Sequence, residues 1–128
     1  MNPENDELLY VLGNFALREG DKPGAAGYYA RALKANAENH GAHNNLGLLL
    51  LEQGQLTEAE AHFRQAIASK SAVATYHSNL ATALLRLQRN GEAIRELREA
   101  LRLNPDDEKT RLRLRELTGG PPHAGQRK

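Results

Sequence analysis

Apolar residues recur along this chain at three- and four-residue spacing, in short stretches separated by polar turns. Leu9, Leu12 and Ala16 form one such stripe, and Ala59 and Phe63 belong to another. This spacing places the apolar side chains on one face of a helix. The pattern therefore predicts a series of short amphipathic helices.

The polar breaks between the stripes carry the signals of helix ends. Residues 20–23 read Gly-Asp-Lys-Pro, which supplies a helix stop, an Asp N-cap and a first-turn Pro. Residues 53–55 and 89–91 supply two further turns, and residues 104–107, Asn-Pro-Asp-Asp, close one helix and open another. Each unit is thus expected to be a helix, a tight turn and a second helix.

The pattern repeats with a period of 34 residues. Small and large residues stay in one register across three copies, with Gly20 and Gly54 marking the middle of the first two. The aligned columns are Leu12, Leu46 and Leu80; Gly13, Gly47 and Ala81; Ala25, Ala59 and Ala93; Tyr29, Phe63 and Leu97; and Ala32, Ala66 and Ala100. We expect the small second column where the two helices of a repeat approach closely, and the large fourth column projecting toward the next repeat.

These columns resemble the W-x2-L-G-x2-Y, A-x3-F, P pattern of the tetratricopeptide repeat family. The matching residues are Leu9, Leu12, Gly13, Ala16, Ala25 and Tyr29 in the first copy, His43, Leu46, Gly47, Leu50, Ala59 and Phe63 in the second, and His77, Leu80, Ala81, Leu84, Ala93, Leu97 and Pro105 in the third. The chain departs from the pattern where Leu or His replaces Trp, and where Ala37 and Ser71 replace the closing Pro.

The resemblance implies an all-α fold, an α-solenoid of three helix-turn-helix repeats wound as a right-handed superhelix. The repeats span about residues 6–39, 40–73 and 74–107. Residues 106–118 form a charged segment with Leu112, Leu114 and Leu117 on it, as expected of a C-terminal capping helix. We expect one domain over residues 1–118 and a flexible tail over 119–128.

In such a stack the first helices of the repeats line a concave groove. Their faces predict a binding groove for a partner protein. The residues are Tyr10, Asn14, Leu17 and Arg18 in the first repeat, Asn44, Asn45, Leu48, Leu51 and Glu52 in the second, and Ser78, Asn79, Thr82, Leu85 and Arg86 in the third.

The chemistry of this groove is largely apolar and neutral. Asn14 and Asn45 resemble two positions of the clamp with which some members of the family capture C-terminal carboxylates. Its cationic positions hold Tyr10, Thr75 and Asn79 here, so we do not expect capture of that kind. Asn45 and Asn79 are either structural or able to hydrogen-bond a ligand backbone.

The groove leucines favour an extended or amphipathic helical peptide with apolar anchors, bound at roughly micromolar strength. The alternative is that these leucines pack against neighbouring repeats and are not available to a ligand. This alternative applies most to Leu48 and Leu51, because their helix is apolar nearly all round. The expected function is a non-catalytic interaction scaffold.

The composition of the 128 residues agrees with helices, because apolar residues make up 40% and aromatic residues only 5%. No cysteine is present, which excludes disulfides, Cys-type zinc sites and thiol nucleophiles. The apolar run 46–51 is too short for a membrane span of about 20 residues. The acidic N-terminus does not resemble a secretory signal, so we expect a cytoplasmic protein that does not insert into membranes.

The net charge of +1 conceals an asymmetry between the two halves. Residues 1–64 hold five Lys and Arg against nine Asp and Glu, a net charge of −4, and residues 65–128 hold twelve against seven, a net charge of +5. Opposite ends, or an N-terminal face around Leu8, Leu9 and Tyr10, could drive self-assembly into homo-oligomers. Ordinary solvated helix faces also explain the asymmetry.

Other chemistry finds less support. His40, His43 and His77 could suggest a metal site, but His43 and His77 share one repeat column, where packing explains them. No motif of an enzyme or cofactor site is present, so we expect no catalysis, no cofactor and no metal. The basic residues of the cap, Lys109, Arg111, Arg113 and Arg115, alternate with Glu108 and Glu116 and lack aromatic neighbours, so we expect a solvated cap and no nucleic-acid binding.

Overall fold

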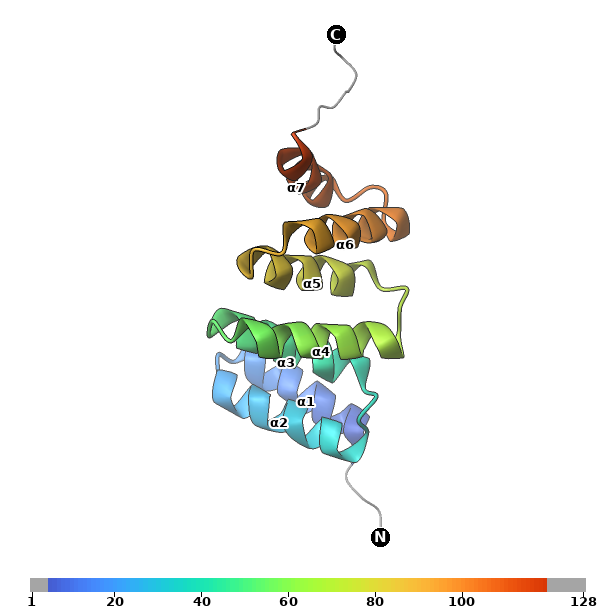
Figure 1. The fold of residues 1–128 in the computed structure, drawn as a ribbon. Helices are drawn as coiled ribbons and strands as arrows, with labels where there is room; N and C mark the ends of the chain where they lie inside the picture. The colour runs from blue at the N-terminus through green and yellow to red at the C-terminus, as the bar shows by residue number, and fades with distance from the viewer. Residues whose placement is uncertain (1–4, 120–128) are drawn as a thin grey trace. The chain divides into compact units, whose positions relative to one another are not determined.

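The computed structural model describes residues 5–119, and these form seven α-helices and no strand (Figure 1). The helices are α1 (Asp6–Arg18), α2 (Lys22–Ala35), α3 (His40–Glu52), α4 (Leu56–Ser69), α5 (Ala74–Arg86), α6 (Asn90–Leu103) and α7 (Glu108–Thr118). The expected all-α fold, with three helix pairs followed by a capping helix, is confirmed. All but the first residue of the expected tail lies outside the described residues.

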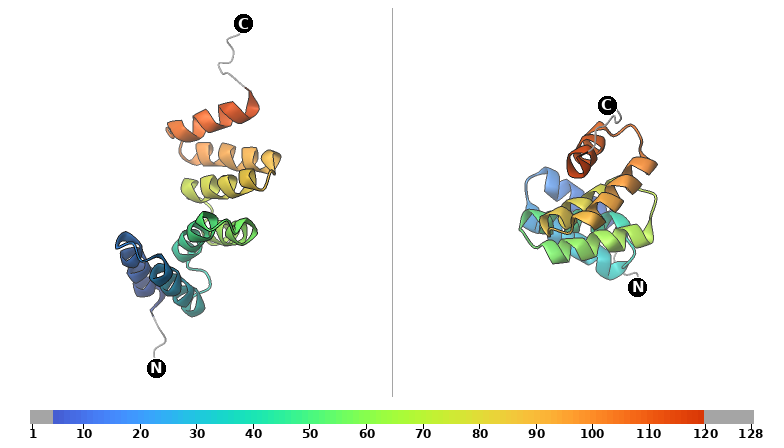
Figure 2. Two further views of the ribbon diagram at one scale, coloured as in Figure 1. Left: turned by 90° about the vertical axis from the view of Figure 1, so that its left-hand side faces the viewer. Right: turned by 45° about the horizontal axis from the view of Figure 1, so that its top comes forward.

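The chain divides into two compact units, residues 1–71 and residues 72–128. In unit 1, α1 packs against α2 and α3 against α4, and α2 also contacts α3, which joins the two pairs. In unit 2, α5 packs against α6, and α7 lies on α6. Figure 2 shows the two helices of each pair side by side. Unit 1 therefore contains two helix pairs of the kind the 34-residue period predicts, and unit 2 contains one such pair and α7.

The first turn of a helix leaves backbone N–H groups without partners, and polar side chains accept from several of them. Asn5 caps α1, Asn39 caps α3, and Asp21 caps α2 by accepting a hydrogen bond of 2.9 Å from the backbone N–H of Gly24. Asp107 caps α7 in the same way. The predicted stop-cap-proline sequence between the first two helices is thus the observed one.

The turn of the third repeat lies earlier than predicted. Gly20 and Gly54 have φ values of +85° and +79°, and 34 residues after Gly54 the same left-handed conformation is adopted by Gln88, with a φ of 65°. Asn90 and Gly91, which we expected in the turn, begin α6. The repeat register thus determines the turn geometry here, against the local preference of glutamine.

The core of unit 1 is built on contacts between glycines and aromatic rings. A Cβ atom on Gly13 would lie 2.5 Å from Cε1 of Tyr29, and one on Gly47 would lie 2.7 Å from Cε1 of Phe63. Both rings are fully buried. Each ring thus packs on the small residue of its own helix pair, and the Tyr29 hydroxyl also reaches Asn45 of the next repeat, from which it accepts a hydrogen bond.

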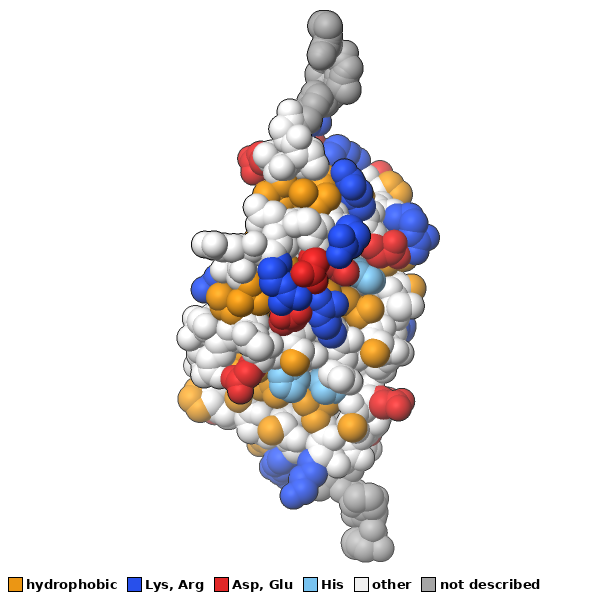
Figure 3. Space-filling view, in the orientation of Figure 1, with side chains coloured by type: hydrophobic (Ala, Val, Ile, Leu, Met, Phe, Trp, Pro, Cys, Tyr) orange, Lys and Arg blue, Asp and Glu red, His pale blue; other side chains and the backbone are white. Residues whose placement is uncertain are grey.

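Charged side chains of both signs are interleaved on the face drawn in Figure 3. Ion pairs between residues three apart in the sequence include Arg89, the N-cap residue of α6, with Glu92 at 2.9 Å. Exposed pairs of this kind contribute about 0–1 kcal/mol each. Within the described part of the chain, no helix is both long and apolar enough to cross a membrane.

Candidate functional site

The predicted groove residues of unit 1 lie on α1 and α3 and differ widely in exposure. Arg18 and Glu52 are exposed, whereas Asn44 and Leu51 are buried and present little surface. The other members are half-buried, namely Tyr10, Asn14, Leu17, Asn45 and Leu48. The apolar surface available on this face is therefore that of partly covered side chains.

Two of the predicted polar residues, Asn14 and Asn45, belong to an internal hydrogen-bond network. The Tyr29 hydroxyl donates to Oδ1 of Asn14 at 2.5 Å, and Nδ2 of Asn45 donates to the same oxygen at 2.9 Å. Asn45 Nδ2 also lies 3.2 Å from the Tyr29 hydroxyl oxygen, to which it donates. The network ties α1, α2 and α3 together, so these amides have a structural role in unit 1.

The Tyr29 hydroxyl is buried, and this burial raises the pKa of the phenol above its usual value of 10.0. The hydrogen bond from Asn45 opposes that rise, and the neighbouring Tyr10 adds to it. The hydroxyl therefore stays protonated at neutral pH and can donate to Asn14. Sequence analysis placed Tyr29 in a packing column and missed this hydroxyl, which Phe63 and Leu97 at the equivalent positions lack.

Tyr10 and Leu17 also serve packing on their inner sides. Both lie against the core cluster of unit 1, and a Cβ atom on Gly41 would come within 2.7 Å of the Tyr10 ring. Glu52 pairs with Lys22 at 2.9 Å, with both side chains more than half exposed. Leu17 and Leu48 are thus the leucines that this face can offer to a ligand, and the exposed charged residues Arg18 and Glu52 lie beside them in the predicted set.

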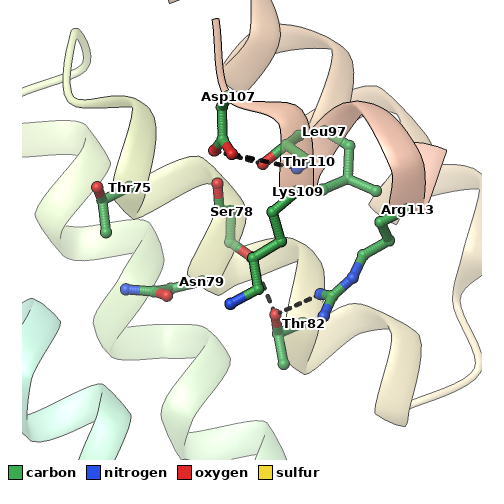
Figure 4. A pocket seen from close by; sticks show the side chains of 9 residues that line it. All are labelled: Thr75, Ser78, Asn79, Thr82, Leu97, Asp107, Lys109, Thr110 and Arg113. Carbon is green, nitrogen blue, oxygen red and sulfur yellow. Dashed lines mark hydrogen bonds between the residues drawn. The ribbon is translucent and has the colours of Figure 1, made fainter. Parts of the chain in front are cut away.

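In unit 2 the predicted α5 residues Ser78, Asn79 and Thr82 line a pocket of about 230 Å³ (Figure 4), whereas Leu85 and Arg86 are not part of its lining. Ser78, Asn79, Thr82 and Leu85 are half-buried, and Arg86 is exposed. The pocket is lined by Thr75, Ser78, Asn79 and Thr82 from α5, Leu97 from α6, and Asp107, Lys109, Thr110 and Arg113 from the α7 segment. The predicted α5 face is therefore a wall of a real hollow, and the opposite wall is the capping helix.

Hydrogen bonds fix two sides of this pocket. A guanidinium nitrogen of Arg113 donates to the Thr82 hydroxyl at 3.0 Å, which joins α7 to α5. Asp107 accepts from the Thr110 hydroxyl at 2.7 Å and from the Thr110 backbone N–H at 3.2 Å. These bonds from Thr110 lower the pKa of the Asp107 carboxyl below its usual 3.8, so it is ionised at neutral pH.

The α7 residues are the part of the site that sequence analysis missed. It noted Lys109 and Arg113 as members of a basic cluster but assigned them to a solvated cap. Their four-residue spacing on α7, which places them on one side of the helix, was the available signal. Which side of α7 faces α5 depends on how α7 packs, and the 34-residue repeat pattern does not determine that packing.

The histidines of unit 1 are explained by packing. The His43 and His62 rings lie 5.2 Å apart between centroids, with 3.0 Å between their Nδ1 atoms, and Nε2 of His43 lies 2.7 Å from the carbonyl oxygen of Ala37. Burial lowers the pKa of His62 below its usual 6.5, the charge on His43 lowers it further, and Glu58 opposes both. Among residues 5–119, no group of three His, Asp or Glu side chains is placed to hold a metal ion.

An apolar stripe on α1 stands outside the predicted groove. Leu8, Val11 and Phe15 are 55–56% exposed and follow one another at helical spacing. The residues 34 positions after Leu8 and Phe15 are Ala42 and Leu49 of α3, and both are buried in the core cluster that includes residues of α2. The α1 stripe thus has the position that α3 uses to pack on a neighbouring helix.

Comparison with known proteins agrees with this architecture. The sequence profile of the tetratricopeptide repeat family matches residues 1–40, 10–74 and 44–108. The chain belongs to the tetratricopeptide repeat family. No curated protein matches the sequence.

Solved structures with the same fold include several domains of this family. The first such domain of Spaghetti (RPAP3), bound to the HSP90 peptide SRMEEVD, is 20% identical over 93% of this chain and 94% of its own, with a TM-score of 0.84. The domain of Arabidopsis OM64 is 25% identical over 93% of this chain and 98% of its own, also with a TM-score of 0.84. Part of the Thermobaculum terrenum O-GlcNAc transferase is 29% identical to this chain, with a TM-score of 0.79. The match covers 88% of this chain and 22% of the transferase chain. The family consists typically of protein-interaction modules.

Proposed function

We propose that this chain is a non-catalytic interaction module that binds a peptide segment of a partner protein through the first helices of its repeats. The candidate binding residues are those of the α1 and α3 face within unit 1 and, taken separately, those of the α5 face within unit 2. The observation that carries the proposal is the pocket beside α5, because the helix face that the repeat register assigns to ligand binding is hollowed. A preformed hollow with a few polar groups is the usual form of a recognition site.

The solved relatives support a peptide as the ligand. The Spaghetti (RPAP3) domain was captured with a seven-residue peptide, SRMEEVD, and it covers nearly the whole of this chain. At 20% identity that likeness concerns the fold alone. The kind of peptide bound must therefore be inferred from the residues of this chain that face the ligand. The partly exposed Leu48 and Leu85 favour apolar anchors in the ligand.

The test is selection of peptides from a random displayed library, followed by affinity measurement with fluorescence polarisation. In the double variant Leu48→Glu and Leu85→Glu, loss of the apolar contacts costs about 1 kcal/mol per half-buried leucine, so affinity falls at least about ten-fold. A double variant with the same charge change on exposed positions of the second helices, Ala30→Glu and Ala61→Glu, keeps the wild-type affinity. Unchanged affinity in the leucine variant, with its helical signal retained, contradicts the proposal.

A second candidate function is self-assembly through the ends of the repeat array, and the exposed α1 stripe favours it. A helix of a second copy could pack on Leu8, Val11 and Phe15 as α2 packs on α3. Light scattering across a concentration series would then show a rising mass, which Phe15→Glu abolishes. Pairing of the acidic and basic ends weakens as salt increases, whereas apolar pairing does not. A constant monomer mass under all conditions excludes this function.

A further inference from the structure

The exposed apolar stripe of α1 consists of Leu8, Val11 and Phe15, each 55–56% exposed. These residues follow one another at i, i+3 and i+7, so they share one face of the helix. Single exposed leucines are ordinary on a protein surface, whereas a contiguous apolar patch marks a surface that contacts another molecule. The stripe therefore needs an occupant.

The repeat register indicates that the occupant is a helix. The residues 34 positions after Leu8 and Phe15 are Ala42 and Leu49 of α3, and both are buried in a core cluster that also contains residues of α2. In unit 1, α3 thus uses this face to pack on the helix before it. On α1 the same repeat face is exposed to solvent, with side chains of the size that helix packing needs.

A second copy of this chain offers a well-matched helix. Within residues 5–119, the large hydrophobic side chains with high exposure are the three of the α1 stripe and Leu112 of α7, which is 44% exposed. A contact of α1 with α1 of another copy covers three such side chains on each side. A contact of α1 with α7 of another copy covers three on one side and one on the other. The pairing of two α1 stripes therefore removes more apolar surface from water.

Two charged side chains beside the stripe favour one direction of pairing. Glu7 and Arg18 are exposed and lie eleven residues apart, about three helical turns, so they flank the same side of the stripe near its two ends. An antiparallel pair with a twofold axis keeps that side of both helices together and places opposite helix ends next to each other. Glu7 of each copy then lies near Arg18 of the other copy. Parallel packing instead places like charges at the same height.

The size of the stripe predicts a weak dimer. Slightly more than half of each side chain is exposed, on the order of 100 Å², so two stripes bury roughly 600 Å² of apolar surface. Since interfaces are about 57% apolar, the whole contact is on the order of 1,000 Å². This area is near the low end for specific interfaces, so we expect a dissociation constant on the order of 100 µM.

We propose that the α1 stripe is a dimerisation surface, on which α1 of a second copy packs antiparallel with Val11 near the twofold axis and Glu7 facing Arg18 of the other copy. The inference rests on the self-assembly given above as the second candidate function and assigns its contact face and direction. The same patch serves both copies, so the assembly closes at two chains. Val11 is not a residue of the predicted groove, so dimerisation and peptide binding are separate properties of the chain.

The first measurement is sedimentation equilibrium of the full chain from about 10 µM to about 1 mM. The mass should rise from that of a monomer to that of a dimer and no further. Val11→Glu places two carboxylates near the twofold axis and should weaken association at least about ten-fold. Gly27→Glu is the matched control, because it adds the same charge at an exposed position of α2 where a Cβ atom meets nothing within 4 Å. It should keep the wild-type association, and circular dichroism checks that both variants remain helical.

Charge reversal tests the direction of the pairing. Glu7→Arg alone, or Arg18→Glu alone, creates two like-charge contacts in each antiparallel dimer and should weaken association about three- to ten-fold. The double variant restores opposite charges across the interface and should recover most of the lost affinity. Weakening in the single variants without recovery in the double variant contradicts the antiparallel arrangement.

Cysteine cross-linking gives an independent measure of which faces meet. The chain has no cysteine, so a single introduced thiol reports directly on the contact between two copies. Val11→Cys should form a disulfide-linked dimer under mild oxidation, because the two side chains face each other at the twofold axis. Leu112→Cys on α7 should stay monomeric. A mixed disulfide between Val11→Cys and Leu112→Cys indicates head-to-tail contact and overturns the inference.

The outcomes distinguish this inference from the functions on which it bears. A constant monomer mass up to about 1 mM overturns it together with the self-assembly candidate. A dimer that persists in Val11→Glu overturns it alone, since self-assembly then uses another face. Peptide binding fails or succeeds independently, because Val11→Glu should keep the wild-type peptide affinity. Leu48→Glu with Leu85→Glu should weaken peptide binding and leave the dimer mass unchanged.

Discussion

The contact between Gly47 and Phe63 gives the sharpest test of how this fold is packed. A Cβ atom added to Gly47 would lie 2.7 Å from Cε1 and 2.9 Å from Cδ1 of Phe63. Carbon atoms in favourable contact are about 3.5–4.0 Å apart, so the overlap is large. The Phe63 ring is fully buried, and protein cores are close-packed with few voids that could accept a displaced ring. We therefore expect Gly47→Ala to destabilise unit 1.

The expected size of the effect is the difference between two opposing terms. Overpacking of a buried site costs about 1–3 kcal/mol, and this overlap belongs in the upper part of that range. Replacement of a helical glycine by alanine contributes about 1 kcal/mol in the other direction. The free energy of unfolding of Gly47→Ala should therefore fall by about 1–2 kcal/mol.

The third repeat shows how the clash can be relieved. There, Ala81 and Leu97 occupy the columns of Gly47 and Phe63, and both are buried. Phe63→Leu alone should cost about 1–2 kcal/mol, less than truncation to alanine, because it removes part of a buried ring. In the double variant the new methyl group occupies space that the ring has left. The two changes should therefore show a favourable coupling energy of about 1–2 kcal/mol.

The assay is urea unfolding followed by far-ultraviolet circular dichroism, with amide hydrogen exchange to locate the change in α3 and α4. Gly27→Ala is the matched control, because a Cβ atom at this helical position meets nothing within 4 Å. It should raise stability by about 1 kcal/mol, the propensity term alone. A Gly47→Ala variant as stable as wild type, or a double variant whose effects simply add, refutes the packing argument.

Three further outcomes follow from single residues. Gln88→Gly should raise the free energy of unfolding by up to about 1 kcal/mol, because the left-handed conformation strains a residue with a Cβ atom, and Gln88→Ala in the same urea assay should give no gain. Tyr29→Phe should lower the free energy of unfolding by about 1–2 kcal/mol, since the half-buried Asn14 and Asn45 amides lose the hydroxyl that is their common partner, and an unchanged urea midpoint contradicts this. The lowered pKa of His62 means that the unfolded chain binds the proton more tightly, so its contribution to stability is complete above the usual 6.5 and is lost as the pH falls through the lowered value. Thermal unfolding from about pH 7 to pH 5 should therefore show a smaller decline in His62→Gln than in wild type.

Within the binding site, the predictable and unpredictable parts differ in how far apart the interacting residues lie in the sequence. The α5 face was found from the repeat register, and Ser78, Asn79 and Thr82 line the pocket as that register implies. The opposite wall comes from Lys109 and Arg113, about thirty residues further on, and their meeting with α5 depends on the angle at which α7 packs. A helical wheel gives the side of α7 that they share but not the helix it faces.

The polar network of unit 1 shows the same limit. Asn14 and Asn45 were noticed on the ligand-facing side of their helices, and Tyr29 was noticed as a packing residue of another helix. Only the packed helices bring the three polar groups within hydrogen-bond distance, which gives the two amides hydrogen-bond partners within unit 1. Leu51 is a similar case, because periodicity placed it on the groove face and the structure buries it.

The helix pairs, their 34-residue period and the family are predictable from the amino-acid order alone, because they depend on local properties: apolar spacing, caps and turn residues that act within a few positions of the chain. The small residues of the repeat pattern also predict close helix contacts at Gly13 and Gly47, and in the structure a Cβ atom at either position would overlap a buried ring. The tertiary structure alone decided which rings fill those contacts, which amides are used internally, and which cations of α7 face α5. These features depend on side-chain directions at helix–helix contacts, where a small rotation of one helix exchanges a buried position for an exposed one.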